Sequence, residues 1–274
     1  MRSMFLTVPA LLILAANASA GLHGVKDVMT TLDGNGDRTL DSVGFVGSPT
    51  VMTPGTISHF NNGTLSYGNH SYGWTAAAPR DMDTSGNKYP GNPDRADHSS
   101  PYGGEANKTG TLQEVFGVNN LSHIIDGEDQ DAWTIDLFMA PGEEVYDDHD
   151  ASTVEFALFE RGWNSKIGVR GIYDSGDGLA YTNAVIVDPE DETYAGWKLN
   201  TLEIGEEQKV AGVGISVDSF GSDAFQFLGF QLFAECDFNG PDIVAVRAQN
   251  NFVPAPGAMA LMGLAGLGIS RRRR

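Results

Sequence analysis

The stretch Trp133-Thr134-Ile135-Asp136-Leu137 decides the fold class of this chain. Large apolar side chains at 133, 135 and 137 alternate with polar side chains at 134 and 136. Successive side chains of a β-strand point to opposite faces of the sheet, so this alternation predicts a strand with one buried and one solvated face. Such half-buried strands are typical of antiparallel sheets that pack one face on a core.

Similar runs follow towards the C-terminus, separated by turn residues at intervals of roughly 8–15 positions. They lie at 154–159, 167–169, 180–187, 197–201, 213–217, 225–233 and 243–246. The side chains expected on the inward faces are Trp133, Ile135, Leu137, Phe156, Leu158, Trp197, Val213, Ile215, Phe227 and Ile243. Many short strands without a long helical period predict an all-β fold. We expect a single antiparallel β-sandwich, jelly-roll-like, over residues 21–251.

The N-terminal half of the sandwich reads as rich in loops. Residues 46–111 carry closely spaced Gly, Asn, Pro, Ser and Thr, which are turn formers. Only brief edge strands fit between these turns, and we expect them at 56–60, 65–67 and 72–75.

The chain begins with a segment typical of a secretory signal peptide. Arg2 precedes an apolar run from Phe5 to Ala16, and Ala18-Ser19-Ala20 is a small-residue cleavage site. We expect residues 1–20 to be removed by signal peptidase after Ala20, following passage through the export machinery.

The last 23 residues have three parts in a fixed order. Pro254-Ala255-Pro256 breaks the preceding structure, an apolar run spans 258–269, and Arg271-Arg272-Arg273-Arg274 ends the chain. Thirteen uncharged residues at 257–269 cover only about 20 Å as a helix, short of the ~30 Å of a bilayer core. This short helix suits a transient membrane stop with the arginines on the cytoplasmic side. A single-span tail anchor is the alternative.

This tail resembles the PEP-CTERM sorting signal of bacterial proteins that an exosortase processes. The family usually has Glu between the two prolines, where this chain has Ala255. The resemblance implies an exported protein that passes through a transient inner-membrane intermediate, contacts exosortase, and reaches the cell surface or extracellular matrix.

Four motifs follow one another within residues 154–247. They are Glu160-Arg161-Gly162-Trp163-Asn164-Ser165, Thr201-Leu202-Glu203-Ile204, Val210-Ala211-Gly212-Val213-Gly214-Ile215-Ser216 and Phe238-Asn239-Gly240-Pro241-Asp242. In this order they resemble a family of exosortase-dependent bacterial surface proteins. The resemblance implies a secreted β domain without an assigned reaction and with no catalytic residues to carry over.

Charge excludes one class of function. The chain has 36 acidic residues against 17 basic ones, and five of the arginines lie in the two processed ends. Nucleic-acid recognition needs clustered Lys and Arg, so the sequence predicts no nucleic-acid partner. The single cysteine, Cys236, cannot form an intramolecular disulfide, so the fold depends on its hydrophobic core.

The only cofactor that the sequence suggests is calcium. Asp33, Asn35 and Asp37 place oxygen side chains at alternate positions, as in the start of a calcium loop. The sixth and twelfth positions of an EF-hand are occupied by Arg38 and Gly44, which rejects that motif. An irregular calcium site and a solvated turn both remain open, and the acidic groups at 126–129, 147–150 and 174–178 are weaker versions.

The sequence favours a non-catalytic secreted surface or matrix protein. The first alternative is a carbohydrate-binding module for exopolysaccharide, with Tyr72, Trp74 and Trp163 as candidate contacts because aromatic rings stack on sugar faces. The second is a secreted hydrolase. The sequence offers no nucleophile or metal motif, and its six histidines lie apart, so no catalytic residue is predicted.

Overall fold

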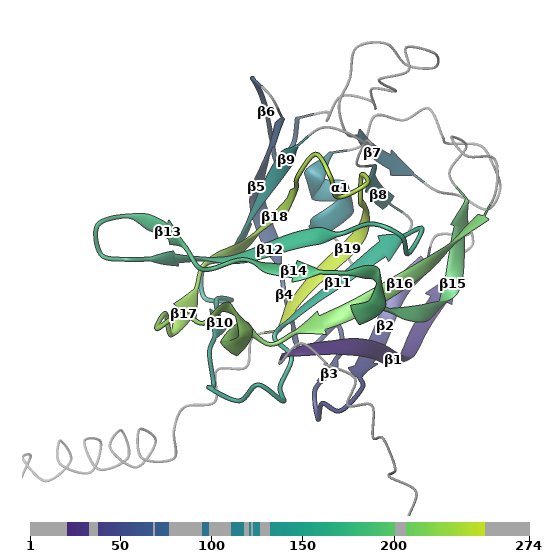
Figure 1. The fold of residues 1–274 in the computed structure, drawn as a ribbon, viewed down its shortest axis with the longest axis horizontal. Helices are drawn as coiled ribbons and strands as arrows, with labels where there is room; N and C mark the ends of the chain where they lie inside the picture. The colour runs from purple at the N-terminus through teal and green to yellow at the C-terminus, as the bar shows by residue number, and fades with distance from the viewer. Residues whose placement is uncertain are drawn as a thin grey trace, which may run out of the picture.

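Two antiparallel β-sheets pack face to face in the protein, whose structure is a computed structural model (Figure 1). The antiparallel β-sandwich predicted from the sequence is confirmed. The structure describes residues 21–32, 38–67, 69–76, 95–98, 111–117, 121, 123–126, 132–200 and 207–249.

Within the described residues, the larger sheet contains ten strands and the smaller one seven. The order in the larger sheet is β3 (Val51–Met52), β2 (Arg38–Phe45), β1 (Leu22–Leu32), β16 (Glu207–Ile215), β11 (Phe156–Arg161), β19 (Asp242–Gln249), β8 (His123–Asp126) and β7 (Arg95–His98). Two further strands pair beside this path, β15 (Thr193–Asn200) with β16 and β4 (Ile57–Ser58) with β19. The C-terminal strand β19 therefore lies in the interior of the sheet.

The smaller sheet contains seven strands. Its order is β13 (Leu179–Tyr181), β12 (Ile167–Asp174), β18 (Gly229–Ala234), β9 (Trp133–Met139), β5 (Phe60–Tyr67) and β6 (His70–Gly73), with β14 (Val185–Val187) beside β12. The pair β10 (Val145–Tyr146) and β17 (Gln226–Phe227) forms a separate ribbon. From β9 to β11, β11 to β12, and β18 to β19 the chain crosses between the sheets. The hairpin of β12 and β13 projects from the body of the protein (Figure 1).

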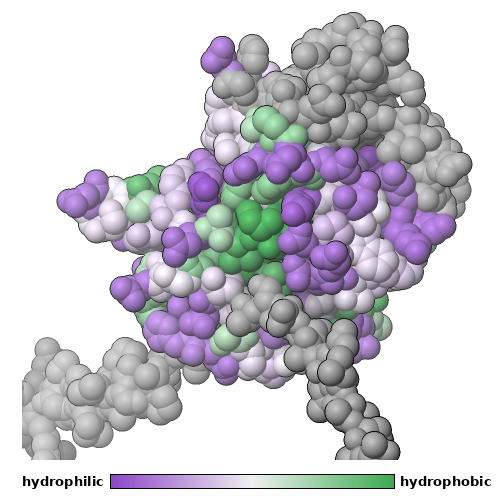
Figure 2. Space-filling view, in the orientation of Figure 1, coloured by the Kyte–Doolittle hydropathy of each residue, from purple (hydrophilic) through white to green (hydrophobic). Residues whose placement is uncertain are grey.

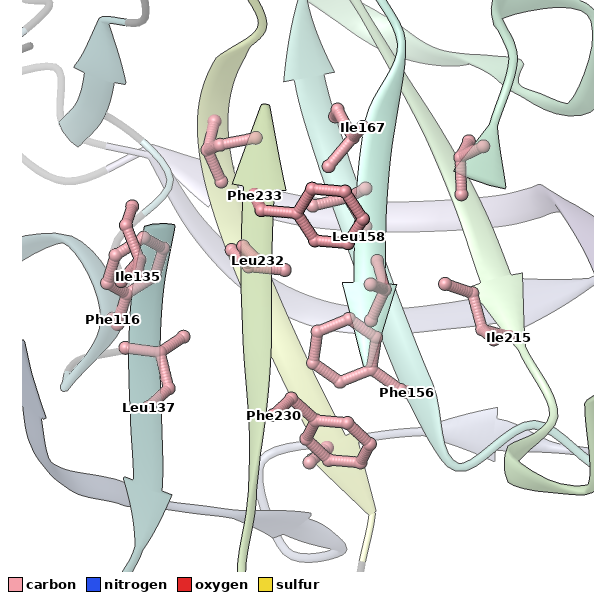
Figure 3. Close-up of a cluster of buried hydrophobic side chains, with 14 of the residues drawn as sticks. Phe116, Ile135, Leu137, Phe156, Leu158, Ile167, Ile215, Phe230, Leu232 and Phe233 are labelled. Carbon is pink, nitrogen blue, oxygen red and sulfur yellow. The ribbon is translucent and has the colours of Figure 1, made fainter. Parts of the chain in front are cut away.

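A first hydrophobic core fills the space between the two sheets (Figure 3). Phe156 and Leu158 face it from β11, and Phe230 and Leu232 face it from β18. The ring centroids of Phe156 and Phe230 lie 4.3 Å apart. All ten side chains predicted to point inward are buried, and nine of them belong to this core.

The tenth, Trp197, belongs to a second core that the sequence did not predict. This core lies on the opposite face of the larger sheet, because Ala157 and Phe159 contribute to it while Phe156 contributes to the first. Strands β1 and β15 pair with different halves of β16, and β2 continues from β1. Side chains of β2 and β15 then cover the outer face of β11 and β16, so β11 is buried on both sides.

Two glycines of β16 make room for this second core. A Cβ atom at Gly212 would lie 2.7 Å from a ring carbon of Phe159, and one at Gly214 would lie 2.5 Å from a ring carbon of Phe45. These approaches are shorter than van der Waals contact, so the aromatic rings occupy the space that a side chain would take. The glycines of the Val210–Ser216 motif thus serve packing.

The N-terminal half has more regular structure than the sequence predicted. Strand β5 runs from Phe60 to Tyr67, and the long strands β1 and β2 precede it. A short helix, α1 (Leu112–Phe116), begins with a capping box in which the Thr111 hydroxyl accepts from the Glu114 backbone N–H and the Glu114 carboxylate accepts from that of Thr111. Helix α1 contacts β5 of one sheet and β8 and β19 of the other, so it closes one end of the sandwich. In the part of the chain that the structure describes, no helix is long and apolar enough to cross a membrane.

Candidate functional site

The motif that begins at Glu160 forms the turn between β11 and β12. Gly162 has φ = 107° and Trp163 has φ = 58°, both in the left-handed region. A Cβ atom at Gly162 would lie 2.5 Å from the side-chain oxygen of Asn164, so glycine is required there by conformation and by space. The backbone shape of this turn therefore depends on Gly162.

The motif Phe238–Asp242, which leads into β19, is hydrogen-bonded to this turn. The hydroxyl of Ser165 donates to the carbonyl of Asn239 at 2.9 Å, and the backbone N–H of Lys166 donates to the carbonyl of Phe238 at 3.0 Å. Two turns far apart in the sequence therefore form one unit at the end of the sandwich. The contact between the two turns is a finding of the structure.

A buried ion pair lies at the base of this unit. Both Nε and Nη2 of Arg161 donate to Oδ2 of Asp242, at 3.0 and 2.6 Å, and both residues are buried. The pair connects the last residue of β11 to the first residue of β19. A guanidinium held in this way does not face solvent, so its role is to fix the two strands.

Two buried glutamates accompany the ion pair. Glu160 is fully buried and accepts a hydrogen bond from the backbone N–H of Trp163 through Oε2. Glu192, after the 3₁₀ turn η1 (Pro189–Asp191), is 5 % exposed. Burial raises the pKa of both carboxyl groups well above their usual range, and for Glu192 the charge of Glu160 adds to the rise. Nothing in the sequence distinguishes these two glutamates from the many exposed ones.

The aromatic side chains predicted to contact sugars lie in two places. Trp163 is half-buried, its indole N–H donates to the carbonyl of Pro189 at 2.7 Å, and the ammonium of Lys209 lies 5.8 Å from the centre of its ring. Tyr72 and Trp74, in and just after β6, are half-buried and pack against the first core. Trp74 also packs against β5 and the C-terminal end of α1, since Cβ atoms at Gly63 and Gly117 would approach its ring to 3.1 and 2.8 Å.

The calcium candidates Asp33, Asn35 and Asp37 lie outside the described residues. Within the described part of the chain, one group has the composition of a metal site: potential ligand atoms of Asp147, His149 and Asp218 lie within 4.8 Å of one another. Asp147 is buried, but its carboxylate already accepts a hydrogen bond from the backbone N–H of His149 at 2.7 Å. Its Oδ2 also lies 3.2 Å from Nδ1 of the His149 ring. The sequence had marked 147–150 as a weak calcium candidate.

A buried acid lies near this group in sequence. Burial raises the pKa of Glu155 to about 7, although its carboxylate accepts hydrogen bonds from the hydroxyl of Thr153 and the backbone N–H of Val217. These bonds tie the loop before β11 to the 3₁₀ turn η2 (Val217–Phe220). The Glu155 carboxylate thus holds these two segments together.

A row of polar side chains crosses the outer face of the smaller sheet. Arg170 of β12 lies opposite Gln231 of β18, which lies opposite Asp136 of β9, which lies opposite Thr64 of β5. Ile135 and Leu137 point into the first core, so Asp136 points away from it. We call these four residues, together with Tyr181, the polar row. Sequence reasoning did not identify it.

Hydrogen bonds run along the polar row. The Gln231 amide donates to Oδ1 of Asp136 at 2.8 Å, the Tyr181 hydroxyl donates to Oδ2 of Asp136 at 3.2 Å, and Nη1 of Arg170 donates to Oε1 of Gln231 at 3.4 Å. The guanidinium carbon of Arg170 also lies 4.6 Å from the centre of the Phe233 ring. The side chains are therefore positioned before any ligand arrives.

A hydrophobic patch lies at β14 on the face shown in Figure 2, within a largely hydrophilic surround. Ile186 of this strand is 37 % exposed. The surface at β14 is therefore hydrophobic, in contrast to the hydrophilic surface of the polar row.

Comparison with known families gives one match, at the C-terminus: residues 252–274 match the PEP-CTERM protein-sorting motif. The tail is a PEP-CTERM sorting signal. This confirms the resemblance drawn from the order of prolines, apolar run and arginines, and the PEP-CTERM motif implies processing by an exosortase, export and association with the surface. The chain matches no curated protein and no solved structure.

The predicted processing residues lie outside the described residues, so the structure does not place them. At the N-terminal end they are Ala18 and Ala20, and at the C-terminal end Pro254, Ala255, Pro256, Arg271, Arg272, Arg273 and Arg274.

Proposed function

We propose that the protein is a non-catalytic surface or matrix protein that an exosortase sorts and processes. The observation that carries this proposal is the PEP-CTERM motif at residues 252–274. The buried charges of the two sequence motifs support it, because Arg161 and Asp242 bind each other inside the protein. Charges used in this way hold strands together and do not reach a substrate.

Processing at both ends is the first expected result. Intact mass spectrometry of the protein from its native host should show loss of residues 1–20 and a second cleavage near Pro254–Gly257. A host strain without the exosortase should accumulate a form that still carries Arg271–Arg274. A mature species with all four arginines in the normal host would contradict exosortase processing and favour a tail anchor.

A second candidate function, carbohydrate binding, is favoured by the polar row. Sugar hydroxyl groups both donate and accept hydrogen bonds, and the row supplies donors from Arg170 and Gln231 and acceptors from Asp136. Tyr181 is 43 % exposed and adds an aromatic ring beside these groups. An extended chain of neutral sugars fits such a face better than an anionic polymer, since the protein is strongly acidic.

This candidate predicts a specific loss of binding. On a glycan array, the purified full-length chain should bind neutral polysaccharides, and Asp136→Ala should weaken that binding about tenfold or more. The reason is that hydrogen bonds to a charged group contribute roughly 1.5–3 kcal/mol. Tyr181→Ala should weaken binding as well.

The matched control is Lys198→Ala, which changes an exposed side chain on β15 of the other sheet. It should bind like the wild-type protein. If Asp136→Ala and Lys198→Ala bind equally well, the sugar does not use the polar row. A loss caused instead by Trp163→Ala or Trp74→Ala would point back to the aromatic contacts predicted from the sequence.

A further inference from the structure

Among the described residues, three buried carboxylate oxygens have no hydrogen-bond partner: both oxygens of Glu192 and Oε1 of Glu160. The two side chains are 5 % and 0 % exposed. A buried ionised carboxyl group with an unpartnered oxygen is strongly unfavourable, so each of the two carboxyl groups must take up a proton or be paired with a positive charge. We propose that Glu160 and Glu192 form a binding site for one hard divalent cation of the calcium class.

Strand pairing brings the two side chains to the same region. Strand β16 lies between β11 and β15, and its residue Ala211 is opposite Glu160 on one side and Tyr194 on the other. Glu192 immediately precedes β15, two positions before Tyr194, and its backbone is extended (φ = −88°, ψ = 156°), so its side chain continues the face that Tyr194 occupies. Ala211, which lies on β16 between the two neighbouring strands, carries only a methyl group. Their mutual influence is seen in the pKa of Glu192, which the charge of Glu160 raises.

Neighbouring charges do not compensate Glu192. Apart from burial, the groups that act on its pKa are the negative carboxylates of Glu160 and Asp191. Arg161 favours the charged form of Glu160, but its guanidinium is held by Asp242. The ammonium of Lys209 lies over two rings, 5.8 Å from the centre of that of Trp163 and 5.7 Å from that of Tyr194. Ionisation of Glu192 would therefore leave a negative charge that none of these neighbouring groups compensates and that a bound cation would balance.

The donor set selects the kind of cation. Carboxylate oxygens are hard ligands, and calcium takes 6–8 oxygens at flexible geometry, of which the three unpartnered ones would supply part. Two carboxylates carry the charge that one divalent ion neutralises. Asp147, His149 and Asp218 are a poorer site, because two of them are exposed and the buried Asp147 already accepts a hydrogen bond from His149.

The test is thermal unfolding of the purified full-length chain, first stripped with a chelator and then titrated with calcium. At a calcium concentration 100 times Kd, binding to the folded state should raise Tm by roughly 5–10 °C. Glu192→Gln should abolish this rise. Asp218→Asn, which alters the exposed acidic group, should keep it. Isothermal titration calorimetry should give one ion per chain for the wild type and none at this site for Glu192→Gln.

Glu192→Gln should fold, because glutamine keeps the shape of the side chain and removes a buried charge. Glu160→Gln provides a second variant with the same expected loss of the calcium response. If Glu192→Gln responds to calcium like the wild type, the proposal is wrong, and the shared rise reflects screening of an acidic chain. It is also wrong if the wild type ignores calcium while Glu192→Gln is the more stable protein, since the pair then holds a proton.

Discussion

Truncating Phe156 to alanine is expected to lower the free energy of unfolding by about 3–5 kcal/mol. The side chain is fully buried, and its ring packs at 4.3 Å from that of Phe230, across the interface of the two sheets. Removing it takes contacts from both layers and leaves a cavity between rigid strands. Because typical domains are stable by only 5–15 kcal/mol, this one change should remove a large part of the total.

Urea denaturation followed by tryptophan fluorescence measures this loss. The matched control is Phe225→Ala, because Phe225 is 54 % exposed and should cost well under half as much. Trp197→Ala, in the second core, should be as damaging as Phe156→Ala. If Trp197→Ala were nearly neutral while the half-buried Trp163→Ala unfolded the protein, the assignment of the two cores would be wrong.

Breaking the ion pair of Arg161 and Asp242 is expected to have the second-largest effect. Asp242→Ala leaves a buried guanidinium without its carboxylate, and such changes cost about 3–5 kcal/mol. The double variant Arg161→Met with Asp242→Leu should recover much of that loss, because two buried apolar side chains replace two buried charges. The same urea experiment measures both proteins.

A surface ion pair provides the comparison. Lys166 and Asp188 approach to 2.9 Å but are substantially exposed. Lys166→Ala should change the free energy of unfolding by about 0–1 kcal/mol. Equal effects of Asp242→Ala and Lys166→Ala would mean that the interior pair does not hold β11 against β19.

The strands around the first core could be predicted because their sequences alternate. Strand β9 is the clearest case, with buried residues at every second position from Trp133 to Met139. Strands β11 and β16 are buried on both faces, yet their inward residues were still identified correctly. In these strands, the alternation of the sequence predicts the same inward side chains that the packing of the two sheets buries.

Strands β1 and β2 were missed because their sequences do not alternate. The pairing of β1 with β2 shifts register between Lys26 and Met29 and again before Thr30, and Asp27 has φ = 50°. Irregularities of this kind displace side chains from their expected faces, and the period of two is lost. The second core could not be foreseen for the same reason, since β2 supplies part of it. Helix α1 did carry a signal, the Thr111-x-x-Glu114 capping box.

The candidate sites depend on long-range pairing, which one sequence does not show. Glu192 stands in the acidic stretch Asp188-Pro189-Glu190-Asp191-Glu192, and its burial follows from the place of β15 beside β16. The polar row likewise arises from the order β12, β18, β9, β5, in which no two neighbours are consecutive strands of that sheet along the chain. Residue type alone could not bring these side chains together.

The interior position of β19 has a consequence for the order of events at the membrane. Residues 242–248 of this strand pair with β11, and the strand ends at Gln249, just before the sorting signal begins at Phe252. A protein exported N-terminus first cannot complete its larger sheet while β19 is still inside the translocation channel. The sandwich therefore closes only when translocation has nearly reached the tail. A pause with the arginines on the cytoplasmic side would give the domain time to fold beside the membrane before its release.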